Sequence, residues 1–474
     1  MFTNYSLGGF ARLTVAGLAL AGVTGRSIAA DLGGNCCADL EERIAELEAT
    51  TARKGTRKVS LTISGYINEA LMWFDAGDER NIYQGTNETA RSRFRFLGEA
   101  KITGDWKAGY LLELGARSNR LNRTNQDIAS VRSGQPFEMR HAAWWIDNKT
   151  YGRVWLGQTS QATDGITELT TVNTGHFARL SLSKFNGGFF LVTKNGVRTE
   201  NIWRNIEPSD GVSGDNVPGE GDRRNLVKYE TPVFEGFKVS ASWGEDDFWD
   251  VGLRYAGDWA GFKIAAGIGY AEYTDDSEGD NIRGCAGLDP SGSITSQSDT
   301  SCNTIGLSAS IMHEATGLFV TGAYGRKSDD LRGERFAAAG IAGIPIDSKD
   351  DFWAVQAGIE RKFISLGKST LFAEYWRANT GAQVGDTNGD PQSFQSVSDA
   401  VGLGFAKARS SGSEASYWGV GFNQNIEAAA LDLYVIYHHN MGQTDLFDAN
   451  ATANRATVEF QDVDIVMSGA KISF

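Results

Sequence analysis

Three arginines occupy every second position of one short segment: Arg91, Arg93 and Arg95. Alternate side chains of a β-strand point to the same face, so this spacing predicts a row of fixed positive charge. Lys107 and Arg140 are expected beside it on neighbouring strands. Such a row could attract anions or orient polar solutes in a narrow aqueous gap. The simpler interpretation is that a strand face in contact with water needs polar residues, among which arginine is common.

Patterns for catalysis or metal binding are poor by comparison. The histidines at positions 141, 176, 313, 438 and 439 form no HExxH motif and no deaminase-type zinc motif. The sequence has no GxSxG nucleophile elbow and no phosphate-binding loop. We therefore expect no enzyme, no catalytic residue, no metal site and no cofactor. The net charge of −14 argues against nucleic acid as a partner, because that would call for a basic surface.

The charged row belongs to a chain that consists largely of predicted strands. Sixteen segments alternate apolar and polar residues, at about 59–73, 90–102, 105–116, 137–147, 151–158, 224–231, 236–243, 249–256, 262–273, 303–313, 318–327, 351–362, 369–379, 415–425, 430–440 and 463–474. Short turns alternate with longer loops between them, apart from a short loop after the seventh segment. This rhythm is typical of an even-numbered transmembrane barrel.

Composition supports the same fold class. The chain of 474 residues has 57 glycines, 7 prolines and 11% aromatic residues. Its mean hydropathy is −0.30, and beyond the N-terminus it lacks the runs of about twenty apolar residues that membrane helices need. We predict an all-β protein, a transmembrane antiparallel β-barrel of 16 strands that crosses the bacterial outer membrane many times.

The last predicted strand ends on an aromatic residue, Phe474. A terminal phenylalanine closing an alternating strand is typical of outer-membrane barrels and marks the C-terminus for barrel assembly. We expect this strand to close the wall beside the first one. Ile472 and Phe474 would then face lipid, while Lys471 and Ser473 face water.

Aromatic residues near strand ends are expected to form girdles at the two membrane surfaces. They are Trp73, Phe74, Trp145, Trp243, Trp249, Trp259, Trp353, Trp376 and Trp418. His438 and His439, near the end of another predicted strand, are expected at the same interface.

The chain divides into three predicted parts. Residues 1–30 have an arginine ahead of a short apolar stretch and small residues at a cleavage site, as a signal peptide does. Residues 31–56 would remain in the periplasm and contain a short amphipathic helix at 39–49, either packed on the barrel mouth or pairing with other protomers. Residues 57–474 form the barrel.

Two of the four cysteines, Cys285 and Cys302, bracket a loop rich in Gly, Ser and Asp. A disulfide between them is one prediction in an oxidising compartment, and two free thiols are the alternative.

The sequence resembles the general porins of alphaproteobacteria in several stretches. They are Cys36–Gly65 (CCADLEERIAELEATTARKGTRKVSLTISG), Trp144–Asp147 (WWID), Tyr151–Gly157 (YGRVWLG) leading into Thr159–Gly165 (TSQATDG), and Lys471–Phe474 (KISF). The similarity covers essentially the whole chain after the signal. It implies a sixteen-stranded, trimeric outer-membrane porin that passes small hydrophilic solutes by passive diffusion.

In sixteen-stranded porins, the third outer loop folds into the lumen and narrows it. Here that loop spans 159–223, far beyond ordinary connection lengths. It carries Asp164 and Glu168 near its start, and an apolar run at 187–192 that would pack inside. These carboxylates are expected opposite the arginine row, so that a transverse field crosses the narrowest part of the pore.

The resemblance also implies the partners. They are outer-membrane lipids and lipopolysaccharide, the barrel-assembly machinery, two further copies in a homotrimer, and small hydrophilic solutes. Two alternative functions stay open. A solute-selective porin would show a second basic ladder or an aromatic track, and a structural or adhesive barrel would have its lumen plugged by residues 159–223.

Overall fold

The computed structural model describes residues 58–131, 137–180, 185–208, 217–244, 248–274, 287–288, 299–382 and 391–474. The predicted signal peptide, the predicted N-terminal helix and Cys285 lie outside the described residues. Among the helices of the described ranges, none has the length and apolar character that crossing a membrane requires.

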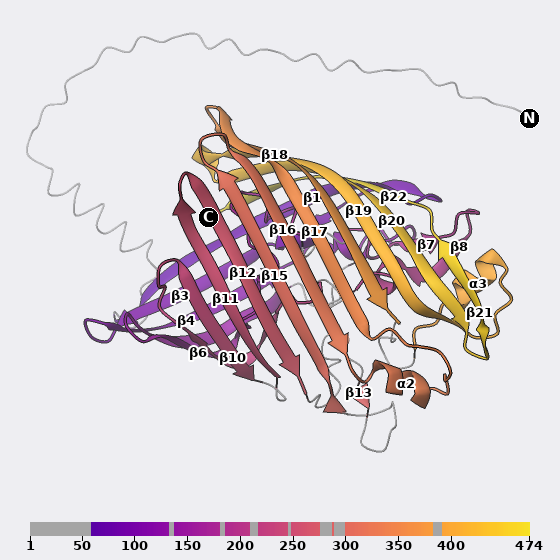
Figure 1. The fold of residues 1–474 in the computed structure, drawn as a ribbon. Helices are drawn as coiled ribbons and strands as arrows, with labels where there is room; N and C mark the ends of the chain where they lie inside the picture. The colour runs from indigo at the N-terminus through magenta and orange to yellow at the C-terminus, as the bar shows by residue number, and fades with distance from the viewer. Residues whose placement is uncertain are drawn as a thin grey trace, which may run out of the picture. The chain divides into compact units, whose positions relative to one another are not determined.

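Sixteen strands form the wall of a closed antiparallel barrel, which confirms the predicted fold class (Figure 1). In chain order they are β1 (Ser60–Asp75), β3 (Arg93–Lys101), β4 (Trp106–Ala116), β5 (Phe137–Asn148), β6 (Gly152–Ser160), β9 (Arg223–Glu230), β10 (Phe237–Gly244), β11 (Phe248–Trp259), β12 (Phe262–Tyr273), β15 (Cys302–His313), β16 (Leu318–Asp329), β17 (Lys349–Ile364), β18 (Gly367–Gly381), β19 (Ala408–Ile426), β20 (Leu431–Asp448) and β22 (Val463–Ser473). Each pairs with the next, and β22 returns to pair with β1 in a register from Tyr66↔Ser473 to Asp75↔Asp464. Closure leaves the wall without a free edge.

Smaller elements lie in the loops between the wall strands. Within the described residues they are β2 (Arg80–Thr86), β7 (Phe190–Val192), β8 (Arg198–Ile202), β13 (Gly287–Leu288), β14 (Asp299–Thr300), β21 (Ala451–Glu459), α2 (Arg332–Ala338), α3 (Gln395–Val401), and single 3-10 turns at Glu88–Ala90, Leu121–Arg123, Trp203–Asn205 and Glu427–Ala429. Strands β2 and β21 pair with β1 and β20 and extend the wall at the end with the long loops. Sequence alternation alone did not predict them. In Figure 1, α2, α3 and β21 gather at that end of the barrel.

Alternation sorts the wall residues between lumen and exterior. In β1, for example, Leu61, Ile63 and Leu71 are exposed on the outer face, whereas Asn68 and Met72 are buried inside. Because neighbouring residues of a strand point to opposite faces, an apolar outside and a mostly polar or loop-covered inside follow directly from the sequence.

Of the nine aromatic residues predicted for the girdles, six face outward, as a girdle requires, and three do not. The six on the exposed outer face are Trp73, Trp243, Trp249, Trp259, Trp353 and Trp418. Phe74, Trp145 and Trp376 are buried inside the barrel instead. Position near a strand end does not decide the face, and Phe74 and Trp145 each directly follow an outward-facing tryptophan.

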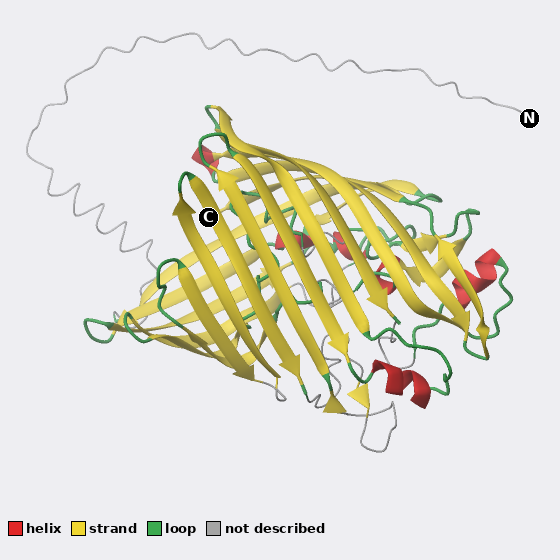
Figure 2. Ribbon diagram, in the orientation of Figure 1, coloured by secondary structure: helices red, strands yellow, loops and turns green. Residues whose placement is uncertain are grey.

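The long connection between β6 and β9, residues 161–222, is here called L3. Figure 2 shows loop and short helical segments within the ring of strands. L3 follows the inner wall closely: the Thr163 N–H donates to Asp250 of β11 at 2.7 Å, and the Leu169 N–H donates to Ser308 of β15 at 3.1 Å. Inward folding of the third outer loop is thus observed.

Glycines on the inner face make this close approach possible. A Cβ atom at Gly269 of β12 would lie 2.7 Å from Thr163, and one at Gly267 would lie 2.7 Å from Leu169. A side chain at either position would push these L3 side chains aside, so glycine at both positions lets L3 lie close to the wall.

The second half of L3 packs as a hydrophobic core against β1, β20 and β22. Phe177, Phe189 and Trp203 of L3 are almost fully buried in one cluster with Phe74 and Met467 of the wall. The apolar run at 187–192 therefore lies inside, as predicted.

His438 also belongs to this interior, so its predicted place at the membrane interface is wrong. Its Nε2 lies 2.7 Å from Glu374 of β18, and its ring stacks between Phe185 and Tyr417 with centroids 5.2 and 4.3 Å away. His439 points to the outer face and contacts Asp464 at 2.7 Å. The two histidines take opposite faces because they are adjacent in one strand.

Candidate pore constriction

Three arginines of the inner wall converge on one carboxylate, Glu113 of β4. Arg95 Nη2 lies 2.5 Å and Arg93 Nη1 lies 3.3 Å from its oxygens, and Arg140 Nε lies 2.7 Å away. Glu113 is fully buried, while the Arg95 side chain is 44% exposed. One carboxylate thus holds three guanidinium groups together on the inner face, and the cluster keeps a net positive charge.

A β-bulge brings Arg140 into this cluster. Glu113 pairs with His141, but the next residue, Leu114, pairs with Met139, so Arg140 has no partner in the ladder. Arg140 and His141 are consequently both buried on the inner side. Bulges re-aim side chains in this way, and the simple alternation used for the sequence could not indicate it.

Arg91 lies just before β3 and takes part in a second cluster nearer the long loops. It contacts Glu88 at 3.2 Å and Glu138 at 2.9 Å, and Arg117 contacts the same two carboxylates at 3.2 and 2.8 Å. The predicted row is therefore divided: Arg93 and Arg95 share Glu113, whereas Arg91 belongs with Arg117.

Lys107 does not join the arginines. It pairs with Glu99 at 2.7 Å. It lies six positions before Glu113 in β4, roughly 20 Å away at the rise of a strand. Lys107 thus lies on the inner wall toward the end with the short turns.

The two predicted loop carboxylates lie in the first part of L3, each beside a basic residue. Asp164 accepts a hydrogen bond from Ser160 at 2.5 Å and lies 3.6 Å from Arg223 of β9. Glu168 contacts Arg179, also in L3, at 2.6 Å. Neither carboxylate is a lone negative charge.

Electrostatics place Asp164 close to the arginine cluster. Burial alone would raise the pKa of Asp164, but Arg223, the Ser160 hydroxyl, His141 and Arg140 outweigh it and hold this pKa at about 2. Asp164 is therefore charged across the physiological pH range.

Arg179 is held in its charged form as well. Burial would lower its pKa, but Glu168 and the Tyr66 phenol raise it above its ordinary value despite Arg223 nearby. Fixed charges of both signs therefore lie on this part of the wall and on the adjoining part of L3.

Sequence reasoning missed Glu113, Arg179 and Arg223. Glu113 follows the inward parity of β4 and could have been found from its register with Arg95. Arg223 starts a strand and Arg179 lies within L3, where no periodicity indicates which way a side chain points.

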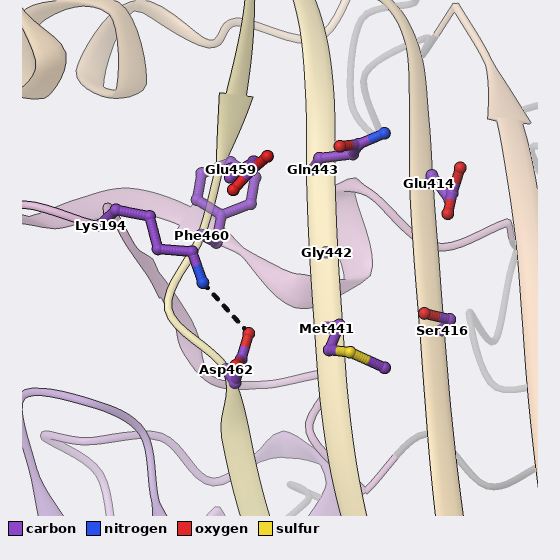
Figure 3. Close-up of a pocket in the computed structure, with 9 residues that line it drawn as sticks. All are labelled: Lys194, Glu414, Ser416, Met441, Gly442, Gln443, Glu459, Phe460 and Asp462. Carbon is purple, nitrogen blue, oxygen red and sulfur yellow. Dashed lines mark hydrogen bonds and ion pairs between the residues drawn. The ribbon is translucent and has the colours of Figure 1, made fainter.

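L3 also reaches the outer rim through the β7–β8 hairpin. The Gln461 N–H, just before β22, donates to the Val192 carbonyl at 2.7 Å, and Lys194 Nζ lies 3.3 Å from Asp462. Figure 3 shows Lys194 pointing toward Asp462 beside Phe460, in a notch also lined by Glu414, Ser416 and Gln443. Two contacts thereby attach the hairpin to the segment just before β22.

The C-terminal residue and Cys302 both lie within the described residues. Phe474 is exposed on the outer face, exchanges two 3.0 Å backbone hydrogen bonds with Gly65, and has its ring 5.7 Å from that of Phe94. Cys302 is disulfide-bonded, and Cys285 lies outside the described residues. Among the described side chains, no three His, Cys, Asp or Glu residues group as metal ligands.

Known proteins are similar to this chain in sequence profile and in structure. The profile of the family described as Gram-negative porin matches residues 13–445. Among solved structures, the chain is similar to an anion-selective porin from Comamonas acidovorans at 15% identity, covering 88% of this chain and 100% of that one with a TM-score of 0.49. OmpT of Vibrio cholerae matches at 11% identity, covering 89% of this chain and 99% of that one with a TM-score of 0.47. Salmonella typhi OmpF, in complex with daunomycin, matches at 13% identity, covering 88% of this chain and 98% of that one with a TM-score of 0.44. Among curated proteins, none matches this sequence.

Proposed function

Because the chain belongs to the Gram-negative porin family, we propose that the Glu113 cluster and the facing part of L3 form the constriction of its channel. The protein is an outer-membrane porin that lets small hydrophilic solutes diffuse passively across the membrane. Arg93, Arg95 and Arg140 would form the basic wall, with Asp164 and Glu168 on the loop side. The partly exposed Arg95 guanidinium beside a buried carboxylate carries this proposal.

Fixed charges on two sides of a narrow aqueous gap produce a field across it. A polar solute aligns its dipole in that field, whereas an apolar solute has to displace oriented water. The ion pairs Asp164–Arg223 and Glu168–Arg179 keep the loop side nearly neutral. The excess positive charge therefore comes from the arginines on Glu113, and they would decide how strongly anions are favoured.

A structural barrel with a plugged lumen fits less well. A plug would have to cover the inner wall of β3 and β4, yet Lys107 and Glu99 there keep 45% and 40% of their side-chain surface exposed. Purified protein in a planar bilayer tests the channel directly. We expect stepwise increases in conductance, and a protein that inserts without conducting would contradict the proposal.

We also propose that the protein works as a homotrimer. Support comes from Glu69, which has outward parity in β1 and receives hydrogen bonds from Thr86 at 2.8 Å and Ser118 at 2.7 Å. A carboxylate on a lipid-facing surface is unfavourable, so contact with a second copy would shield it. Mobility of unheated protein in denaturing gels tests this: Glu69→Ala should weaken the trimer, and a chain that runs as a monomer before heating would contradict it.

The remaining parts of the chain have proposed roles too. Residues 1–30 would be removed on export and residues 31–56 would stay in the periplasm, which the N-terminal sequence of the outer-membrane form can check. Phe474 would serve recognition by the barrel-assembly machinery, so that its deletion lowers the amount inserted. A Cys285–Cys302 disulfide would pin the loop after β12, and the mass of peptides from unreduced protein would identify the pairing. Lipids and lipopolysaccharide would surround the trimer.

A further inference from the structure

A row of alternating charge crosses the inner wall near the short, periplasmic turns. It runs over five neighbouring strands: Lys107 of β4, Asp147 of β5, Arg153 of β6, Glu230 of β9 and Lys238 of β10. Lys107 is in register with Asp147, Asp147 with Arg153, and Arg153 with Glu230. Lys238 completes the row with a 2.9 Å contact to Glu230. Acid and base therefore alternate on one level of the wall.

Two tryptophans line the wall directly beside this row. The Arg153 guanidinium carbon lies 4.2 Å from the Trp145 ring centroid and 5.4 Å from that of Trp155, and Lys228 Nζ lies 5.7 Å from Trp155. Both indoles are at least nine-tenths buried. Within the described part of the chain, neither indole N–H has a hydrogen-bond partner. Trp145, expected in the outer girdle, thus belongs to an aromatic and basic track inside the lumen.

The row borders a cavity of about 410 Å³. Asp147, Arg153, Glu230 and Lys238 line it, together with parts of the two turns that follow β5 and β9. This volume falls within the range of sites for small organic molecules. The Arg153 and Lys238 side chains keep 31% and 37% of their surface exposed, so incoming solutes can reach both cations.

We propose that this row and cavity form a transient binding site for zwitterionic solutes of the α-amino acid type. The carboxylate of the solute would contact Arg153 or Lys238, and its ammonium group would contact Asp147 or Glu230. A simple anion would be attracted by the two cations but repelled by the two carboxylates. A simple cation would be attracted by the carboxylates but repelled by the cations. Only a solute carrying both charges matches the alternation. The inference rests on the proposed function, because solutes entering from outside reach the row through the constriction.

The decisive variant removes one acid and one base together, Asp147→Asn with Arg153→Gln, so that net charge is unchanged. The control is Lys263→Gln with Glu314→Gln, which removes another ion pair, 3.4 Å long and more exposed, near the same end of the barrel. Proteoliposome swelling would be compared for L-alanine and glycerol, which are similar in size. Since an accessible ion pair contributes up to about 1 kcal/mol, we expect the alanine-to-glycerol rate ratio to fall about 2- to 5-fold in the first variant only.

An unchanged ratio in the first variant, or an equal fall in both variants, would overturn the inference. A measurement on the unaltered protein covers the case in which the variant does not fold. L-alanine added on the periplasmic side should lower single-channel conductance in a saturable way, whereas glycerol should not, and identical responses would also overturn it. Conductance in salt alone tests the proposed channel separately, so failure of the amino acid site is distinguishable from failure of the channel.

Discussion

The inner wall of this barrel has two sides. Side chains alternate between lumen and exterior on both, but one side is exposed to water and the other is buried. On β3 and β4 the inward residues include Arg93, Arg95, Glu99, Lys107 and Glu113, and Arg95 and Lys107 remain nearly half exposed. On β17 to β19 the inward residues Phe352, Trp376 and Tyr417 are buried, and the Trp376 and Tyr417 rings stack at 5.6 Å and 10°. One side is a wet wall and the other resembles the core of a soluble domain.

The difference lies in what covers each side. The packed side continues from β17–β19 through β20 and β22 to β1. There L3 packs its aromatic second half against the wall and excludes water. Among the polar groups in this region, Glu374 contacts both His438 at 2.7 Å and Gln356 at 2.9 Å. L3 therefore does more than narrow the lumen, since it fills one side and leaves the charged side for solutes.

The largest expected effect comes from opening the packed side. Phe189 of L3 is fully buried, with its ring 4.5 Å from that of Phe74. Phe189→Ala should lower the free energy of unfolding by about 3–5 kcal/mol because it leaves a cavity in a close-packed region. We also expect higher and noisier single-channel conductance, since L3 would be held less firmly. Urea denaturation and bilayer recordings measure the two effects.

The matched control is Phe234→Ala, in the turn after β9, where the side chain is largely exposed. Its effect on unfolding should stay within about 0.5 kcal/mol. If Phe189→Ala behaved like this control, the core-like description of the packed side would be wrong.

On the wet side, the strongest effect should come from Glu113. Glu113→Gln keeps the shape but removes the negative charge that three arginines share, so the free energy of unfolding should fall by roughly 2–3 kcal/mol. The arginines would then carry an uncompensated charge, and selectivity should shift toward anions. Reversal potentials in a salt gradient measure that shift.

The comparison variant is Glu99→Gln, whose carboxylate is 40% exposed and contacts only Lys107 among the ion pairs of the described residues. Its effect should be smaller in both measurements. Equal shifts from the two variants would mean that Glu113 does not organise the arginines.

The sequence was sufficient to predict the arginine row of the wet side but not its ion pairs, and it was insufficient for the packed side. Parity in β3 and β4 put Arg93 and Arg95 on the inner face, because alternation is a local property of a strand. The bulge at Arg140 and the inward turn of Trp145 depend on pairing between strands, which no single segment reveals. The path of L3 depends on tertiary packing, although inner-face glycines such as Gly267 and Gly269 are a signal that could have indicated it.

L3, the loop that separates the two sides, should resist acid because of Asp164. The pKa of Asp164 lies at about 2, below the ordinary value of 3.8. The ionised Asp164 carboxylate thus stabilises the folded state by roughly 2 kcal/mol in total. This stabilisation is fully present above the ordinary pKa and is lost as pH falls through about 2. We expect conductance to stay constant from pH 7 to about 4 and to change below about 3.

Asp164→Asn provides the check, because it removes the titrating group. This variant should show altered conductance already at neutral pH and a weaker acid transition. A transition in the unaltered protein centred near pH 4 would mean that Arg223 and Ser160 do not hold the Asp164 carboxylate.

The smallest effects separate the members of the arginine row. Replacing Arg91, Arg93 and Arg95 together by Gln should shift selectivity toward cations. Each single replacement should change the free-energy preference of the pore for anions over cations by less than about 1 kcal/mol. Among these replacements, Arg95→Gln should shift the reversal potential more than Arg91→Gln. Arg95 is 44% exposed to the lumen, whereas Arg91 is 12% exposed and contacts Glu88 and Glu138. Equal shifts would show that strand parity alone sets the influence of a wall charge, and a larger shift from Arg91 would move the constriction toward the long loops.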